Sequence, residues 1–315
     1  MKGITYANFK IYVNRYYNTF AGANLRKKLL FLLSRTALYI VLVQTSFVFL
    51  FPFIYMVVNS LKGDFHMLDV TSRWIVQNPN WANYQRAISD MNYWETLGNT
   101  DYVSVLSAIG QVLSCAFVAY GFSRFKFPGR DIAFSMVLLS IVVPPQILSI
   151  PLFMQYSRLG FMDTFLPIII PSFFGMGLRG GLFIFIFRQY FKGLPVQLEE
   201  AARVDGCGVL RTYWSIIFPI SKSPMLVTAI LSIVWHWNDF VAPMIFLNAP
   251  ERRLVQIALQ MLGMDRFSLF FTDAGIVVNP LGMAGSVLVV LPLIIIYLLL
   301  QKQFMRGIES AGLAN

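Results

Sequence analysis

Long runs of apolar residues, separated by shorter polar segments, form the pattern of the whole chain. A helix rises about 1.5 Å per residue, so roughly 20 apolar residues span the hydrocarbon core of a membrane. The runs are continuous and do not alternate with period two, which favours helices over a β-barrel. We predict membrane helices at about residues 36–60, 98–122, 132–152, 164–190, 223–247 and 284–304.

The composition agrees with this pattern. The chain has 315 residues, of which 57% are hydrophobic and only 13% are charged, whereas soluble domains usually carry about 25% charged residues. The predicted fold class is therefore an all-α integral membrane protein with about six transmembrane helices. The two cysteines, Cys115 and Cys207, are too few for a disulfide framework.

The positive charges predict the orientation in the membrane. Most Lys and Arg residues outside the apolar runs lie in 1–35, 123–131, 188–222 and the C-terminal tail, and fewer lie in the intervening segments. The positive-inside rule places the first group, and thus both termini, in the cytoplasm. Segment 1–35 is then an ordinary basic anchor or, as the less favoured alternative, lies along the anionic inner membrane surface. Scattered basic residues without a compact motif argue against nucleic-acid binding.

The sequence contains no constellation that predicts catalysis or metal binding. His66 and His236 have no ligand-spaced partners, and there is no phosphate-binding P-loop. Gly175, Gly177 and Gly180 match a dinucleotide-binding pattern, but they lie inside an apolar run with no preceding strand. Close helix packing explains these glycines far better. We predict no catalytic residue, no metal site and no cofactor bound by this chain.

Three polar residues inside the predicted spans are candidates for a solute pathway. A charge at the centre of a membrane helix costs about 2.5–3.5 kcal/mol on insertion scales. Arg179 and Asp239 should therefore face the protein interior, either as satisfied structural groups or as pathway-lining groups, and the two alternatives are equally favoured. Asn238 precedes Asp239 and joins this candidate set.

One polar stretch, "LPVQLEEAARVDGCG" at 194–208, interrupts the apolar pattern on the predicted cytoplasmic side. Pro195 suits the first turn of a helix and acidic residues suit its positive N-terminus. Gly206 can end that helix in a left-handed conformation. A second apolar helix follows and stops or kinks at a proline. We predict a helix–turn–helix whose alanines lie on its exposed side, where another backbone can approach. Its candidate residues are Glu199, Glu200, Ala201, Ala202, Asp205, Gly206, Ile216 and Pro219.

This stretch resembles the EAA loop, E-A-A-x-x-x-G-x(9)-I-x-L-P, of ATP-binding-cassette importer permeases. The motif matches from Glu200 to Pro219, except that Phe218 stands where the family usually has Leu. The resemblance covers roughly residues 36–315, and other stretches resemble the carbohydrate-uptake branch, similar to the maltose-system subunits. They are "AYGFSRFKFPGRD" at 119–131, "VVPPQILSIPLF" at 142–153, "VWHWNDFVAPMIFL" at 234–247 and the ending "QKQFMRGIESAGLAN".

The resemblance implies a translocation subunit in a bacterial or archaeal cell membrane. It implies a second homologous permease, a cytoplasmic ATPase dimer that uses ATP and Mg, an extracytoplasmic solute-binding protein and a carbohydrate substrate. The coupling loop, about 191–222, would dock on the ATPase. An ion-coupled secondary transporter remains the alternative, although we find no convincing internal repeat. An integral-membrane enzyme is disfavoured because a catalytic constellation is missing.

Overall fold

The computed structural model describes residues 6–63, 74, 76, 78–267, 271–272, 275–276 and 279–312. The chain divides into two units, residues 1–58 and 59–315, and we describe each by itself. The first unit consists of helix α1, which runs without a break from Tyr6 to Ser60. Residues 6–35 of the predicted basic segment and the predicted first span thus belong to one helix. His66 lies outside the described residues.

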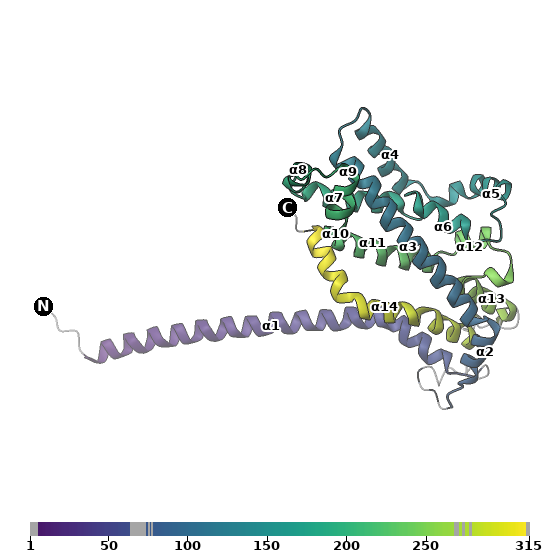
Figure 1. The fold of residues 1–315 in the computed structure, drawn as a ribbon. Coiled ribbons are helices and arrows are strands. Elements are labelled where there is room, and N and C mark those ends of the chain that lie inside the picture. The colour runs from purple at the N-terminus through teal and green to yellow at the C-terminus, as the bar shows by residue number, and fades with distance from the viewer. Residues whose placement is uncertain are drawn as a thin grey trace. The chain divides into compact units, whose positions relative to one another are not determined.

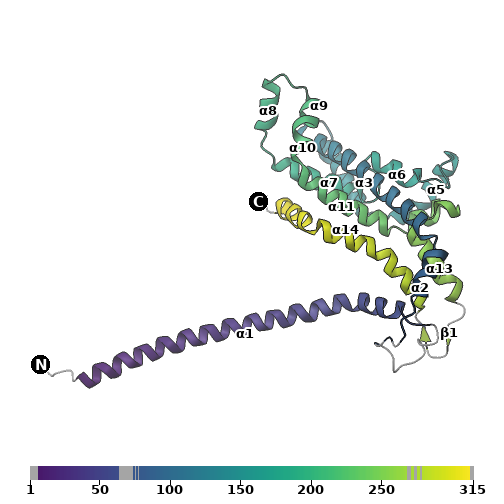
Figure 2. The same cartoon turned by 60° about the horizontal axis from the view of Figure 1, so that its bottom comes forward.

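The second unit is almost entirely helical (Figures 1 and 2). The described exception is a two-residue ladder of β1 (Phe271–Thr272) and β2 (Gly275–Ile276), which the sequence pattern did not predict. The helices are α2 (Ala82–Asp90), α3 (Tyr93–Arg124), α4 (Arg130–Val142), a 3₁₀ turn (Pro145–Leu148), α5 (Ser149–Arg158), α6 (Leu166–Phe173), α7 (Gly180–Gly193), α8 (Gln197–Val204), α9 (Val209–Thr212), a π-helical segment (Tyr213–Ile217), α10 (Phe218–Ile220), α11 (Lys222–Asn238), α12 (Val241–Phe246), a 3₁₀ turn (Pro250–Arg252), α13 (Val255–Phe267) and α14 (Pro280–Gly312).

Within the described residues, three helices are long and apolar enough to cross a membrane unbroken. They are 30–60 of α1, all of α3 and 280–302 of α14, and they coincide with the first, second and last predicted spans. Two bent pairs bring the number to five if each pair counts as one span. These pairs are α4 with the following 3₁₀ turn and α5, bent by 98°, and the helix ending at Ile220 with α11, bent by 75°.

The other three predicted spans are not single helices, which corrects the sequence prediction. Residues 132–152 break at Pro144 and Pro145, where Val143 and Pro144 both take an extended conformation (ψ 121° and 127°). A proline removes a backbone donor and forces the preceding residue out of the helical region. Residues 164–190 break between α6 and α7, and residues 223–247 break between α11 and α12.

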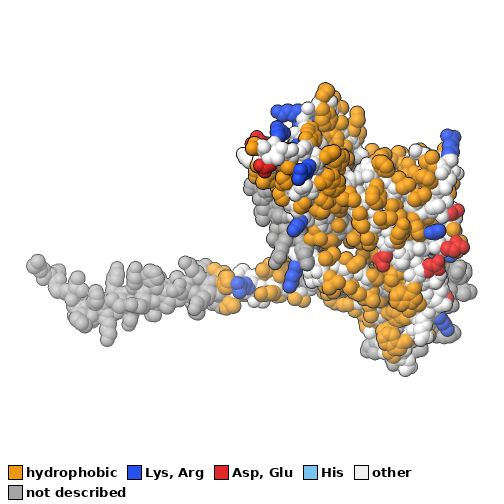
Figure 3. Space-filling view, viewed as in Figure 1, with side chains coloured by type: hydrophobic (Ala, Val, Ile, Leu, Met, Phe, Trp, Pro, Cys, Tyr) orange, Lys and Arg blue, Asp and Glu red, His pale blue; other side chains and the backbone are white. Residues whose placement is uncertain are grey.

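Helix α3 is the centre of the second unit, and α6, α7 and α11 pack against it. In Figures 1 and 2, α8 and α9 lie at one end of this unit, and α2 and α13 lie at the other. Hydrophobic side chains cover most of the visible face of the second unit, and Lys and Arg side chains gather near α8 (Figure 3). Such a surface fits a lipid-facing belt with a basic end outside the membrane.

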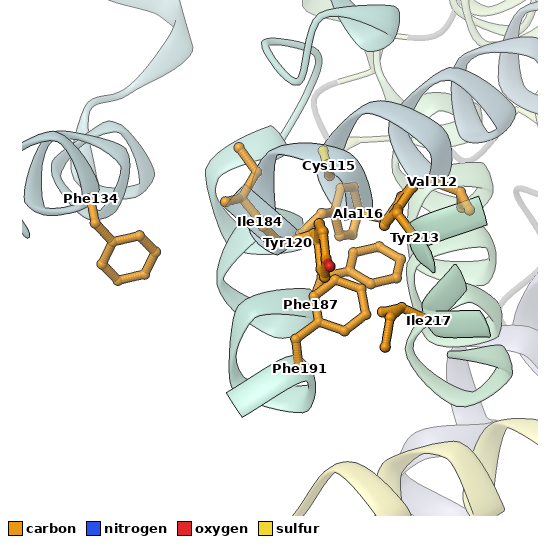
Figure 4. Close-up of a cluster of buried hydrophobic side chains, with 12 residues drawn as sticks. Val112, Cys115, Ala116, Tyr120, Phe134, Ile184, Phe187, Phe191, Tyr213 and Ile217 are labelled. Atoms are coloured by element: carbon orange, nitrogen blue, oxygen red, sulfur yellow. The ribbon is translucent and has the colours of Figure 1, made fainter. Parts of the chain in front are cut away.

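The core at the α8 end joins α3 and α7 to the helix that follows α9. Phe187 and Phe191 of α7 are fully buried beside Tyr120 of α3. Tyr213 and Ile217 of the π-helical segment complete this cluster, in which the aromatic rings face one another (Figure 4). The ring centroids of Tyr120 and Tyr213 are 5.0 Å apart. The second half of the predicted loop is therefore packed firmly on the membrane helices.

Candidate functional site

The predicted helix–turn–helix is present, and its first helix is α8. Glu199 and Glu200 lie in the first turn, where the helix dipole favours carboxylates. The helix ends as the sequence predicts, with Gly206 in the left-handed region at φ 78°. The N–H of Cys207 donates to the carbonyl of Ala202 at 2.9 Å, and the N–H of Gly206 donates to that of Arg203 at 3.0 Å. This pair of bonds is a Schellman motif, which closes the turn.

The two alanines of α8 face opposite ways. Ala201 is exposed, but Ala202 is only 3% exposed, so the prediction that both lie on the exposed side is wrong for Ala202. An amphipathic helix of this length has one face against its own protein, and Ala202 belongs to that face. Glu200 and Asp205 are exposed beside Ala201.

Two apolar residues at the tip of the loop escaped the sequence analysis. Val204 is 88% exposed and Leu210 is 61% exposed, although many residues of the surrounding segment are polar. An apolar side chain that is exposed at the end of a polar loop indicates a protein contact. The signal available in the sequence was Val204 itself, an isolated valine between Arg203 and Asp205.

The second helix of the loop changes its winding before it ends. Phe218 donates its N–H to Tyr213, five residues back, so Tyr213–Ile217 forms a π-helical turn. Pro219 follows in α10 and the chain bends by 75° into α11, in agreement with the predicted stop or kink. Ile216 is half-buried against the Tyr213 cluster, whereas Pro219 is exposed. Single π turns of this kind are common at functional sites.

An ion pair ties α8 to the end of α3. Nε of Arg124 lies 2.7 Å from Oε1 of Glu199, and the two side chains are only 10% and 13% exposed. A second nitrogen of Arg124 donates to the carbonyl of Leu194 at 2.9 Å. The sequence analysis named Glu199 but missed Arg124, because nothing local in the sequence shows that the two residues meet.

The three intramembrane polar candidates have separate surroundings. Oδ1 of Asp239 accepts hydrogen bonds from the N–H groups of Val241 at 3.1 Å and Ala242 at 3.4 Å, so the carboxylate caps the start of α12. The side-chain amide of Asn238, which is exposed, donates to Val234 of its own helix. These two hydrogen bonds give Asp239 a structural role, which is one of the two alternatives that the sequence left open for it.

Arg179 occupies the break between α6 and α7. It has a left-handed backbone (φ 62°) directly before α7. Its side chain is exposed in this single chain, so the expected interior position is not observed for it. The guanidinium carbon lies 5.5 Å from the centroid of the Trp235 ring, within range of a cation–π contact.

The glycines around Arg179 permit a close backbone approach within the break between α6 and α7, where the sequence predicted close helix packing. A Cβ added at Gly180 would collide with the carbonyl of Gly175, and one at Gly181 would lie 2.6 Å from Oγ of Ser140. The non-helical backbone between α6 and α7 is satisfied from α3. Ser114 accepts from the N–H of Gly175 at 3.0 Å, and Gln111 donates to the carbonyl of Leu178 at 2.6 Å. Irregular backbone at membrane depth needs such protein partners.

The fold defines an integral membrane permease with a helix–turn–helix at one end. Residues 111–310 match the family of binding-protein-dependent transport system inner membrane components, and the chain belongs to this family. It is thus the membrane component of a binding-protein-dependent transport system. The matched region contains the whole coupling loop together with Arg179, Asn238 and Asp239.

Individual relatives support the same family. The chain is 30% identical over 220 residues to the arabinooligosaccharides transport system permease protein AraQ of Halalkalibacterium halodurans, covering 70% of this chain and 74% of the relative. It is 28% identical over 303 residues to a probable starch degradation products transport system permease protein, AmyC of Thermoanaerobacterium thermosulfurigenes, covering 96% and 98%. That second alignment is long enough to include most of segment 1–35.

A solved structure shows the same fold. A bacterial ABC transporter involved in the import of the acidic polysaccharide alginate contains a chain that superposes with a TM-score of 0.70. The superposition covers 84% of this chain and 94% of that chain, at 23% sequence identity. The predicted all-helical permease fold is confirmed.

Proposed function

We propose that this chain is the translocation subunit of an ATP-driven importer of oligosaccharides or related sugars. The relatives named above are permeases for arabinooligosaccharides and for starch degradation products, and a third is a lactose permease, LacG of Rhizobium radiobacter. All three names describe carbohydrate transport, which supports this substrate class.

The proposed complex has three other kinds of protein component. A second homologous permease pairs with this chain, a cytoplasmic ATPase dimer binds ATP and Mg, and an extracytoplasmic protein delivers the sugar. This chain binds no cofactor and does not hydrolyse ATP. It lies in the cell membrane with both termini, and the coupling loop, in the cytoplasm.

The observation that carries the proposal is the geometry of α8 and its turn. The helix presents Ala201, Glu200 and Val204 to the outside, and a Schellman turn at Gly206 closes its end. A small residue beside an exposed apolar one forms a shallow knob that a cleft on another protein can enclose. The charged groups at its rim favour orientation of the partner.

Reconstitution of the complex tests the proposal. The chain is expressed together with the second permease, the ATPase and the binding protein of the proposed complex, purified through a tag on this chain, and placed in liposomes. We expect the ATPase to co-purify, and ATP to drive uptake of one of a panel of labelled oligosaccharides only when the binding protein is present. Uptake that follows a proton or sodium gradient without the ATPase would establish the secondary-transporter alternative instead.

A further inference from the structure

The coupling loop is fastened to α3 through a buried ion pair. The guanidinium of Arg124, at the last residue of α3, reaches both Glu199 of α8 and the backbone carbonyl of Leu194, which joins α7 to the loop. One side chain therefore holds the start of α8 and the end of α7 against α3. One hydrogen bond, to the carbonyl of Leu194, and one close charge contact, to the carboxylate of Glu199, together hold the loop at a set distance from α3.

A second arginine makes the reverse connection from α7. Nε of Arg188, which is buried, donates to the carbonyl of Phe122 in the last turns of α3 at 3.4 Å. Its guanidinium carbon lies 3.7 Å from the ring centroid of Phe134 in α4. Non-covalent contacts of two arginines thus connect the last two turns of α3 to α7 and to the loop. Together with the aromatic cluster of Figure 4, α3, α7 and the loop form one packed body.

The connection from the loop to α11 has a different character. It passes through the π-helical turn Tyr213–Ile217 and then through the bend of 75° next to Ser221. A π turn and a sharp bend are places where a helix changes direction. Direct contacts therefore connect α8 to α3 and α7, whereas the chain reaches α11 only through the bend of 75°.

Stability alone does not account for the buried pair. The desolvation of two charges offsets much of their attraction, and well-packed apolar residues usually stabilise such a position as well or better. What a largely buried arginine that contacts both Glu199 and the carbonyl of Leu194 provides is a defined placement of one element against another. The pair lies on the inner side of α8, away from the exposed surface proposed to meet the ATPase.

We infer that Arg124 and Glu199 are positioning residues that transmit the movement of the coupling loop to α3. The inference rests on the proposed function, because it assigns a role within ATP-driven transport. Breaking the pair then uncouples transport from ATP hydrolysis while the docking surface of Ala201 and Val204 stays available. A merely structural pair would instead lower the amount of assembled complex, and both activities would fall together.

The experiment compares variants in the reconstituted complex at equal amounts of permease. The variants are Glu199→Gln, Arg124→Gln and the exchanged pair Arg124→Glu with Glu199→Arg. Asp131→Asn is the matched control, because it removes an ion pair from the same cytoplasmic segment, to Arg130 at 2.9 Å, that is exposed and does not reach the coupling loop. The readouts are co-purified ATPase, ATP hydrolysis and sugar uptake.

For each single variant we expect the same ATPase recovery as for the parent. The ratio of sugar transported to ATP hydrolysed should fall by about tenfold, because a buried charge without its partner no longer holds α8 against α3. The exchanged pair should recover a large part of the ratio, and Asp131→Asn should keep all of it. The inference would be overturned, and the proposed function would stand, if Glu199→Gln kept the parental ratio of sugar transported to ATP hydrolysed. The same holds if the single variants lost ATPase binding and uptake together and the exchanged pair restored neither. A parent complex without ATP-driven uptake of any tested sugar would overturn the proposed function, and the inference with it.

Discussion

The hydroxyl of Ser232 donates a hydrogen bond of 2.6 Å to the side-chain oxygen of Gln111, deep between α11 and α3. The amide nitrogen of the same glutamine donates to Leu178 in the break between α6 and α7. Gln111 is fully buried. One side chain thus connects three elements and satisfies a carbonyl that has left the helical pattern.

Gln111→Leu should destabilise the permease measurably. The substitution leaves the hydroxyl of Ser232 and the carbonyl of Leu178 without this partner, and a buried unsatisfied group costs about 1–3 kcal/mol. We expect a lower thermal unfolding midpoint in detergent, with intact membrane insertion. The control is Gln301→Leu, because the amide of Gln301 donates to Leu298 within its own helix. Equal unfolding midpoints for the two variants would show that the hydrogen bonds of Gln111 contribute nothing to the stability of the permease.

Gly181→Ala should disturb the packing of α7 on α4. The added Cβ would lie 2.6 Å from Oγ of Ser140 and 2.8 Å from the carbonyl of Val137, so the two helices must separate. Overpacking of this kind costs about 1–3 kcal/mol. Gly121→Ala is the control, since a Cβ at this helical position meets nothing within 4 Å. Thermal unfolding of the two purified variants should show a loss for Gly181→Ala and no loss for Gly121→Ala.

Gly206→Ala and Gly208→Ala form a matched pair within one turn. A Cβ meets nothing within 4 Å at either position, but only Gly206 of the two has a positive φ. A side chain in the left-handed region costs about 1 kcal/mol or more. We expect Gly206→Ala to lower ATPase recovery and sugar uptake at unchanged permease abundance, and Gly208→Ala to behave like the parent. Pull-down and uptake on both variants measure this, and indistinguishable results would exclude a role for the turn geometry.

Bulk at the two alanines of α8 should have different effects. Ala201 is exposed, so Ala201→Trp should leave the permease folded and reduce ATPase recovery by about tenfold or more, a change of roughly 1.4 kcal/mol in binding. Ala202 is buried, so Ala202→Trp should displace α8 itself and increase protease cleavage of the loop in the free permease. Limited proteolysis and pull-down on both variants separate the two effects. Normal ATPase recovery in Ala201→Trp would remove this face of α8 from the docking surface.

Topology can be tested with single cysteines in a background of Cys115→Ala and Cys207→Ser. Positions 80 and 260 are expected to label from outside intact cells, and position 205 only after the membrane is opened. Asp205 and Gln260 are exposed in the structure and Asn80 is half-buried, so positions 205 and 260 give the decisive comparison. The physical reason is the excess of Lys and Arg on the side that holds both termini. External labelling at position 205 would reverse the proposed orientation.

Local sequence rules determined the backbone of the coupling loop. Two carboxylates in the first turn, and a glycine where φ must be positive, predicted where α8 lies and how it ends, because capping and left-handed conformations depend on residues close in the chain. The apolar runs likewise predicted where α1, α3 and α14 lie, since the thickness of the hydrocarbon core sets their length. The prolines were visible in the sequence, but not whether a span would bend or break at them.

Only the tertiary structure decided which side chains of these elements are exposed and which distant residues they contact. Which of Ala201 and Ala202 faces outward depends on what lies beneath α8, and that surface comes from residues far away in the chain. The meeting of Arg124 with Glu199 depends on the packing of α7 against α3, which no local pattern encodes. The same holds for Gln111, whose partners belong to two other helical segments. Contacts between distant segments arise only when the helices have packed, so they are properties of the assembled fold.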